Sequence, residues 1–108
     1  MSDQDFLDQW YAWTHIAPKK VEYNSSGDII QLDLSGLDIN VLPPQICQLR
    51  TLNLASNILS QLPETIDQLI HLEELNLNNN RLTQLPQNIG QLPNLHKFEK
   101  NYQLVIQK

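Results

Sequence analysis

The stretch HLEELNLNNNRLTQLPQNIGQLPNLHKF, residues 71–98, decides the fold of this chain. It carries a Leu-x-Leu pair at Leu75 and Leu77, an asparagine three residues later at Asn80, and then a Leu-Pro pair. The preceding stretch QLRTLNLASNILSQLPETIDQL, residues 48–69, carries the same markers in the same order. A chain that repeats one set of markers at a regular spacing builds one structural unit more than once.

The Leu-x-Leu pairs set the length of the repeated unit. Their first members are Leu32, Leu52, Leu75 and, in a degenerate fourth pair, Phe98. The last two steps between them are equal and the first step is shorter. The Leu-Pro pairs shift in the same way, so the first unit is shorter between its proline and the next Leu-x-Leu pair. A period of roughly 20–25 residues is typical of a solenoid of stacked coils.

Each marker has a physical reason. Successive side chains of a strand alternate between two faces, so both leucines of a pair point one way and the residue between them points the other way. Asn57 and Asn80 stand where a buried amide can bond the backbone of its own loop and of the next coil, which predicts a ladder of asparagines. Pro63 and Pro86 lack an N–H and block further strand pairing. One coil cannot bury its leucines alone, whereas stacked coils can.

The repeated markers resemble the leucine-rich repeat family, in the Leu-Pro/Ile class with units of roughly 23 residues that is found in small bacterial proteins. The resemblance covers roughly residues 30–104. It implies an α/β fold: a short solenoid with a concave parallel sheet, an irregular or 3₁₀ convex side and a helical cap at the N-terminus. The first unit departs from the family pattern at Leu37, and the last departs at Lys100 and Gln103. Atypical residues are expected in terminal coils, which act as caps.

The N-terminal residues predict a cap on the first coil. Ser2 and Asp5 match a capping box, and the apolar residues that follow at helical spacing predict a helix over residues 3–15. Its tryptophans, Trp10 and Trp13, could form an aromatic patch that binds a ligand, but we expect them to pack on the first coil. The sequence VEYNSSGDIIQLDL that follows the helix predicts a strand, a turn at NSSG and a second strand.

The whole chain is expected to form one domain. Residues 1–29 would be a helix-and-hairpin cap, residues 30–92 the coils, and residues 93–108 a degenerate repeat or second cap. Leu104, Val105 and Ile106 leave two interpretations open. They could fold over the last coil, or they could form an open edge strand that pairs with a second copy or with another chain.

Composition narrows the classes of function. The net charge is −5 and the 7 basic residues are scattered, which argues against a nucleic-acid surface. The only cysteine, Cys47, excludes an internal disulfide, indicates a reducing compartment and fits a small apolar filler. The acidic N-terminus does not match a signal peptide. No apolar run approaches the ~20 residues that a membrane span needs. We therefore expect a cytoplasmic protein without a membrane or nucleic-acid partner.

The sequence offers no constellation for catalysis. It has 3 glycines, none in a phosphate-binding loop, and no Cys/His spacing suited to zinc. His71 and His96 occupy near-equivalent positions in successive repeats, but we expect them to be loop residues of the surface. We therefore predict no enzyme activity, no metal and no cofactor.

The exposed strand positions remain as a candidate surface. They are rich in amides, which both donate and accept hydrogen bonds, and family resemblance implies that this concave face and its adjacent loops bind a protein or peptide. The candidate residues are Gln31, Asp33, Ser35, Thr51, Asn53, Glu74, Asn76, Asn78, Lys97 and Glu99. Ala55 and Asn101 fall in the same columns, and Arg81 is the nearest candidate for an anchor. Alternatives are a homodimer through the C-terminal edge and an inhibitor of one specific protein.

Overall fold

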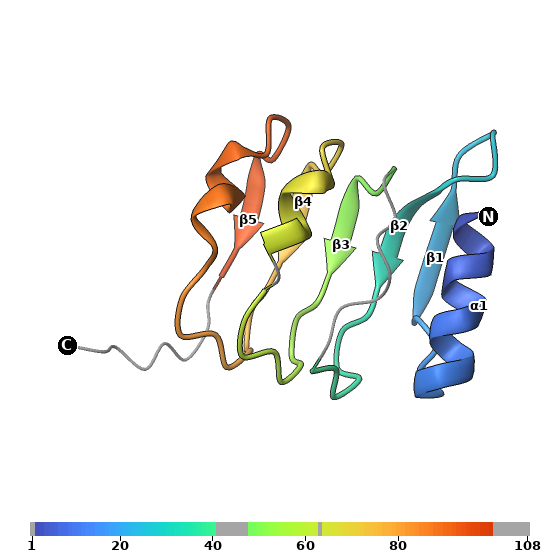
Figure 1. Cartoon of the computed structure of the whole chain (residues 1–108), viewed down its shortest axis with the longest axis horizontal. Coiled ribbons are helices and arrows are strands. Elements are labelled where there is room, and N and C mark those ends of the chain that lie inside the picture. Colours follow the sequence, from blue (N-terminus) through green and yellow to red (C-terminus); the bar gives the residue numbers. More distant parts are fainter. Residues whose placement is uncertain (1, 41–47, 63, 101–108) are drawn as a thin grey trace.

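A single sheet organises the described part of the chain, which comprises residues 2–40, 48–62 and 64–100 of a computed structural model (Figure 1). The elements are α1 (Asp3–Thr14), β1 (Lys20–Tyr23), β2 (Ile29–Asp33), β3 (Thr51–Asn53), η1 (Glu64–Gln68), β4 (Glu74–Asn76), η2 (Gln87–Gln91) and β5 (Lys97–Glu99), where η marks a 3₁₀ helix. The strands lie in the order β1-β2-β3-β4-β5. Spatial order thus follows chain order, as it does when each unit stacks on the one before.

The register of the sheet follows the repeat. Strand β1 runs antiparallel to β2, and every later pair is parallel. The first members of the Leu-x-Leu pairs face one another across the parallel ladder, in the order Leu32, Leu52, Leu75 and Phe98. The first repeat is shorter than the other two, but β2 pairs with β3 in the same register as the later strands do. The predicted spacing of the repeat is confirmed.

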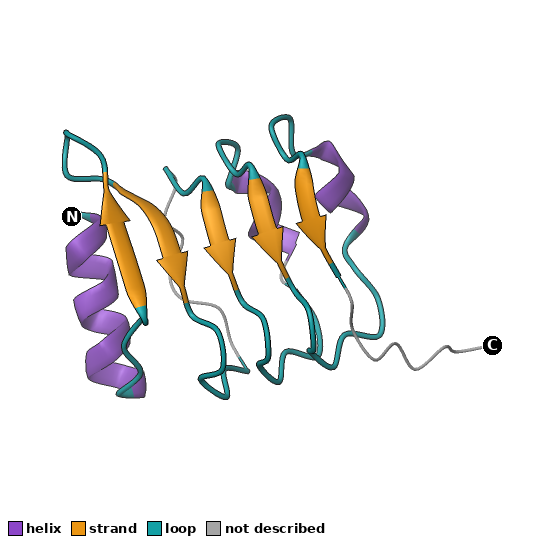
Figure 2. Cartoon of the chain, turned by 180° about the vertical axis from the view of Figure 1, so that it is seen from behind, coloured by secondary structure: helices purple, strands orange, loops and turns teal. Residues whose placement is uncertain are grey.

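The core lies between the sheet and the two 3₁₀ helices. Elements η1 and η2 lie side by side on one side of the sheet, and Figure 2 shows the sheet from its opposite face. Both leucines of every complete pair are buried: Leu32, Leu34, Leu52, Leu54, Leu75 and Leu77. Further buried residues come from the turns and the 3₁₀ side, among them Leu59, Leu82, Ile66, Leu69 and Leu72. Full burial of one such side chain stabilises the fold by about 1.5–3 kcal/mol.

The turns after β2, β3 and β4 use a left-handed backbone. Gly36, Ser56 and Asn79 each lie two residues after the second leucine of their pair, with φ of 66°, 59° and 60°. Glycine and asparagine adopt this conformation more readily than other residues. The Gly36 N–H donates to the Ala55 carbonyl (2.9 Å), and the Ser56 N–H donates to the Asn78 carbonyl (2.8 Å). The turns therefore stack on one another as the strands do.

Helix α1 closes the β1 end of the sheet. The Ser2 hydroxyl oxygen accepts the Asp5 N–H (3.2 Å), and Asp5 Oδ2 accepts the Ser2 N–H (3.0 Å), so the predicted capping box is confirmed. The helix ends at Thr14, within one residue of the predicted end, because His15 takes a left-handed conformation. The Asp3 carboxylate accepts the N–H of Ile29, the first residue of β2 (2.9 Å). This bond ties the start of the helix to the sheet.

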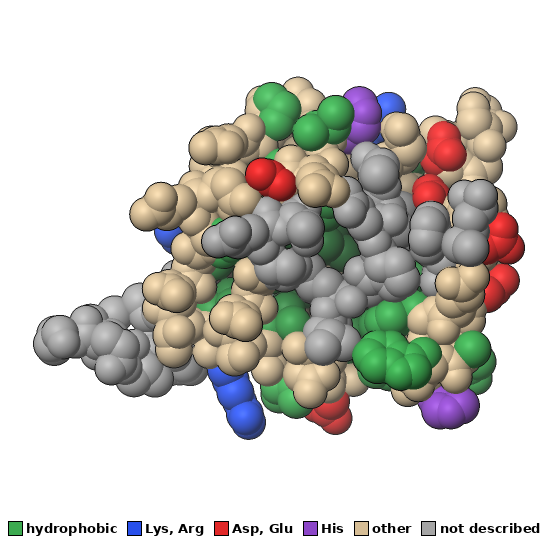
Figure 3. Space-filling model, viewed as in Figure 1, with side chains coloured by type: hydrophobic (Ala, Val, Ile, Leu, Met, Phe, Trp, Pro, Cys, Tyr) green, Lys and Arg blue, Asp and Glu red, His purple; other side chains and the backbone are tan. Residues whose placement is uncertain are grey.

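The predicted packing of both tryptophans is wrong for one of them. Trp10 is buried in the core together with Leu7, but the side chain of Trp13 is 74% exposed. The reason is helical geometry: each step of three residues turns about 60° in the same direction, so Trp13 lies about 120° from Leu7, outside the narrow stripe that a short helix buries. Hydrophobic atoms are accordingly visible over the C-terminal end of α1 (Figure 3). The NSSG turn forms as predicted, and the Gly27 N–H donates to the Asn24 carbonyl (3.1 Å).

The last described coil is less buried than the coils before it. Phe98, Leu85, Ile89 and Leu95 are only half-buried, although their counterparts one repeat earlier are buried. Several predictions fall outside the described residues: those on Leu42-Pro43, Cys47, Pro63, Asn101, Gln103 and Leu104–Ile106. In the described ranges, no helix has the length and apolar character needed to cross a membrane.

Candidate interaction face

The side of the sheet opposite the core carries the candidate residues. We call it the polar face and define it by Gln31, Asp33, Ser35, Thr51, Asn53, Glu74, Asn76, Asn78, Lys97 and Glu99. The strand register brings these side chains into columns across β2, β3, β4 and β5. One column is Gln31, Thr51, Glu74 and Lys97, and the next is Asp33, Asn53, Asn76 and Glu99. Most of these side chains are half-buried by their neighbours, so they form a continuous polar layer.

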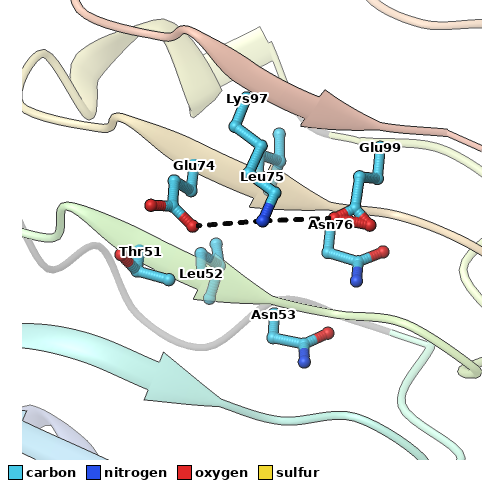
Figure 4. A pocket seen from close by; sticks show the side chains of 8 residues that line it. All are labelled: Thr51, Leu52, Asn53, Glu74, Leu75, Asn76, Lys97 and Glu99. Carbon is cyan, nitrogen blue, oxygen red and sulfur yellow. Dashed lines mark ion pairs between the residues drawn. The ribbon is translucent and has the colours of Figure 1, made fainter.

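A shallow depression of about 170 Å³ lies across β3, β4 and β5 (Figure 4). Its lining residues are Thr51, Leu52, Asn53, Glu74, Leu75, Asn76, Lys97 and Glu99. Polar groups of three strands therefore converge on one spot, and the buried strand residues Leu52 and Leu75 complete its lining. A depression of this size fits one side chain of a partner rather than a whole small molecule, because small-molecule sites are typically ~300–1,000 Å³.

Two asparagines of the second column support the turns that follow their strands. Asn53 Oδ1 accepts the Ala55 N–H (3.0 Å), and Asn76 Oδ1 accepts the Asn78 N–H (3.0 Å). Each is a local turn in which the side chain bonds the backbone two residues later. The oxygen of each amide is thus engaged, while its NH₂ group makes no hydrogen bond to another described residue. On the polar face these two asparagines therefore present donors.

Asp33 makes the corresponding turn on β2. Its carboxylate accepts the Ser35 N–H (3.0 Å) and the Ser35 hydroxyl (2.7 Å). Burial raises the pKa of the Asp33 carboxyl, but the two hydrogen bonds from Ser35 and the charges of Lys19 and Lys20 outweigh it. The net result is a pKa below the ordinary value, so Asp33 is a carboxylate at neutral pH.

Charged side chains occupy both ends of the polar face. Lys97 Nζ lies 4.0 Å from Glu74 Oε1 and 3.9 Å from Glu99 Oε1, between the two carboxylates (Figure 4). These pairs are long and exposed, so each contributes little to stability. Asn78 Nδ2 also donates to Glu99 Oε2 (3.4 Å). Lys97 is therefore held loosely enough for a partner to take over either carboxylate.

Two residues of this face were missed in the sequence. Lys20 and Glu22 of β1 stand opposite Asp33 and Gln31 in the antiparallel register, and they form an ion pair of 3.0 Å. Residues directly opposite each other in a sheet share a face. The predicted hairpin could have revealed them. Pairing its two strands outward from the NSSG turn places alternate residues of β1 on the polar face.

The amide of Asn57 is buried and joins two coils. Its Nδ2 donates to the Leu34 carbonyl (2.8 Å) and to the Leu54 carbonyl of its own loop (3.0 Å). Its Oδ1 accepts the N–H groups of Leu37 and Ile39 (both 2.9 Å). One side chain thus satisfies two donors and an acceptor of the coil before it.

Asn80 repeats this arrangement one coil later. Its Nδ2 donates to the Leu54 carbonyl (2.8 Å) and the Leu77 carbonyl (3.2 Å), and its Oδ1 accepts the Leu59 N–H (3.0 Å). The expectation that these amides bond the next coil is wrong, because both bond the preceding one.

The remaining candidates lie apart from the polar face. Arg81 is exposed, and its backbone N–H donates to the Leu59 carbonyl (2.9 Å). His71 and His96 are exposed, but they do not occupy equivalent positions. The N–H of His96 donates to the carbonyl of Glu73, so His96 pairs with the position two residues after His71. Within the described ranges, no group of three or more His, Cys, Asp or Glu side chains gathers in a way that could hold a metal ion.

Comparisons with known proteins agree with this geometry. Residues 47–99 match the family model described as Leucine rich repeat. A search of curated proteins gave no match. The matched residues include strands β3, β4 and β5, the two 3₁₀ helices and both buried asparagines. Together with the register of the leucine pairs, this match identifies the chain as a leucine-rich repeat protein.

Proposed function

We propose that this chain is a non-catalytic interaction module whose polar face, the predicted concave side of a short solenoid, binds a protein or peptide. Leucine-rich repeat domains generally mediate protein–protein interaction and are typically not catalytic. The polar face supports the proposal because it combines free donors, loosely paired charges and a depression that one side chain can fill. A peptide backbone or a polar side chain needs such a mixture of donors and acceptors.

The single observation that carries this proposal is the fixed orientation of Asn53 and Asn76. Their side-chain oxygens are bonded to the backbone, so the two NH₂ groups are already oriented toward solvent. A donor that is held in place loses little conformational freedom when a partner arrives.

The same bonds rule out Asn53 and Asn76 as test positions, because replacing them would weaken the turns. Thr51 is the better choice, since it lines the depression and its hydroxyl makes no hydrogen bond to another described residue. Thr51→Arg fills the depression with a large cation and leaves the turns intact. Gln91→Arg, at an exposed position at the end of η2, is the control with the same added charge.

The experiment is a pull-down with the tagged chain from a lysate of its source organism, followed by titration calorimetry with the captured protein. We expect the parent and Gln91→Arg to bind it, and Thr51→Arg to bind at least about tenfold more weakly. Circular dichroism checks that both variants are folded. Equal binding by the parent and both variants would move recognition away from the polar face and contradict the proposal.

A further inference from the structure

We propose that the outer edge of β5 pairs with β5 of a second copy of this chain, antiparallel and with Phe98 opposite Phe98 of the other copy. This inference concerns the edge of the sheet and does not rest on partner binding at the polar face. Strand β5 is the last strand of the sheet, and among the described residues no other strand lies beyond it. An edge strand with unpaired backbone groups is a template for another strand.

The backbone of β5 has the orientation that this pairing needs. The Lys97 N–H donates to the Glu73 carbonyl (3.1 Å), and the Glu99 carbonyl accepts the Leu77 N–H (2.7 Å). Lys97 and Glu99 therefore direct these backbone groups toward β4. Because alternate residues of a strand address opposite edges, the N–H and C=O of Phe98 point to the outer edge. Two antiparallel copies of β5 would exchange both of these bonds at Phe98, as a hydrogen-bonded pair of residues does.

The charges of β5 match under the same two-fold axis. When Phe98 faces its own copy, Lys97 of each chain lies opposite Glu99 of the other. These positions form non-hydrogen-bonded pairs, whose side chains approach most closely, with Cα atoms ~4.5 Å apart. Lys97 is 59% exposed and its contacts to Glu74 and Glu99 are 3.9–4.0 Å long, so it is free to turn toward a second copy. The sequence Lys-Phe-Glu is thus complementary to itself when antiparallel.

Apolar side chains lie where the two copies would meet on the core side. Phe98 packs against the core but stays half-buried, as do Ile89 and Leu95 of the same coil. The axis passes between the two Phe98 residues, so it places each last coil against its counterpart. This contact would cover the exposed apolar surface of both coils without any change in the stack.

The test is the self-association of the full chain, measured by sedimentation velocity over a concentration series at low salt. We expect the parent to dimerise. Lys97→Glu and Glu99→Lys each place like charges opposite each other in both pairs, and each should raise the dimer Kd by about tenfold or more. An equimolar mixture of these two variants restores opposite charges in both pairs and should form a heterodimer. The double variant Lys97→Glu/Glu99→Lys should self-associate like the parent.

Lys20→Glu is the matched control, because it reverses a lysine on the opposite edge strand of the same face and should leave the dimer intact. The rescue by mixing separates this interface from binding of a different partner at the polar face, which mixing two damaged copies would not restore. A parent that stays monomeric over the whole series overturns the proposal. So does a dimer that ignores both single variants, or a mixture that associates no better than its components.

Discussion

Four asparagines of the middle coils fall into two groups according to what their side-chain oxygen bonds. Asn57 and Asn80 are buried, and their oxygens accept N–H groups of the preceding coil. Asn53 and Asn76 are half-buried, and their oxygens accept an N–H group two residues later in their own turn. The first group holds coils together and the second shapes a single coil. Substitutions in the two groups should therefore have different consequences.

Replacement of the more buried ladder residue tests the first group. Asn80→Ala leaves the carbonyls of Leu54 and Leu77 and the N–H of Leu59 without this partner in a site that water does not reach. Leaving buried backbone groups unpaired costs about 1–3 kcal/mol. We expect the free energy of unfolding, measured by urea denaturation, to fall by that amount.

Asn40→Ala is the matched control, because Asn40 is exposed and makes no hydrogen bond to another described residue. It should change the unfolding free energy by less than about 0.5 kcal/mol. Equal losses in the two variants would mean that burial of the ladder is not what stabilises it.

At this scale the sequence predicts where the amides lie but not what they bond. Spacing from the leucines puts Asn57 and Asn80 on the core side and Asn53 and Asn76 on the other side. The direction of the ladder, toward the preceding coil, depends on how the coils stack and not on the spacing within one repeat. The turns of Asn53 and Asn76 are local, so attention to the backbone two residues on would have predicted them.

Helix α1 depends on its first turn because it is short and carries no basic residue in its last turn. The backbone N–H and then the hydroxyl of Ser2 donate to the Asp5 carboxylate and hold its pKa below the ordinary value of 3.8. A carboxyl whose pKa is lower in the folded state stabilises the fold above its ordinary pKa. This stabilisation is lost as the pH falls through the lowered pKa.

The pH dependence of a cap variant tests this contribution. Ser2→Ala should lower the unfolding free energy by about 0.5–2 kcal/mol at neutral pH, because the helix loses its N-cap. We expect the difference from the parent to shrink as the pH falls below the ordinary value of 3.8 and through the lowered pKa of Asp5, because the protonated carboxyl no longer gains from the Ser2 hydroxyl. Thermal denaturation followed by circular dichroism at several pH values measures it.

Asp5→Asn serves as the control, since an amide oxygen can still accept from Ser2 but does not titrate. In an Asp5→Asn background, the cost of Ser2→Ala should therefore not change in acid through this group. A difference between parent and Ser2→Ala that stays constant down to pH 3 would show that the bond from the Ser2 hydroxyl makes no titrating contribution to the cap.

The elements were predictable where one local signal dominates. The capping box gave the start of α1, and the NSSG turn gave the hairpin. The exposure of Trp13 was not predictable, because Trp10 and Trp13 are both compatible with an apolar stripe until the position of the sheet is known. The 3₁₀ helices likewise depend on how each coil returns over the core.

The stability of the whole stack should depend more on a fully buried leucine than on a half-buried leucine of the same repeat. Leu77 is fully buried, whereas Leu85, in the Leu-Pro pair of that repeat, is half-buried. Leu77→Ala should lower the unfolding free energy by about 2–5 kcal/mol, because the removed methyl groups leave a cavity that rigid neighbours cannot fill. Urea denaturation measures the loss.

Leu85→Ala makes the same chemical change at the half-buried site and should cost clearly less, since solvent or a shifted side chain can replace the lost atoms. If Leu77→Ala were as mild as Leu85→Ala, the assignment of Leu77 to the interior of the stack would be wrong.

The register of the parallel strands was predictable because β2, β3 and β4 repeat the same pair of apolar positions at nearly constant spacing and β5 keeps the first of them as Phe98. The part that β1 plays in the polar face was not, because β1 carries no such pair and joins the sheet in the opposite direction. The polar face therefore includes a strand, β1, that the repeat does not predict.

The direction of the asparagine ladder also bears on how the chain is made. Asn57 reaches back to the groups of Leu34, Leu37 and Ile39, and Asn80 reaches back to the coil of Asn57. A ribosome releases the chain from its N-terminus, so each coil emerges before the amide that completes it. Every newly synthesised repeat then secures the one already outside the exit tunnel. The coils are therefore synthesised in the order in which the asparagines can bond them, and no hydrogen bond of an earlier coil has to break when the next coil is added.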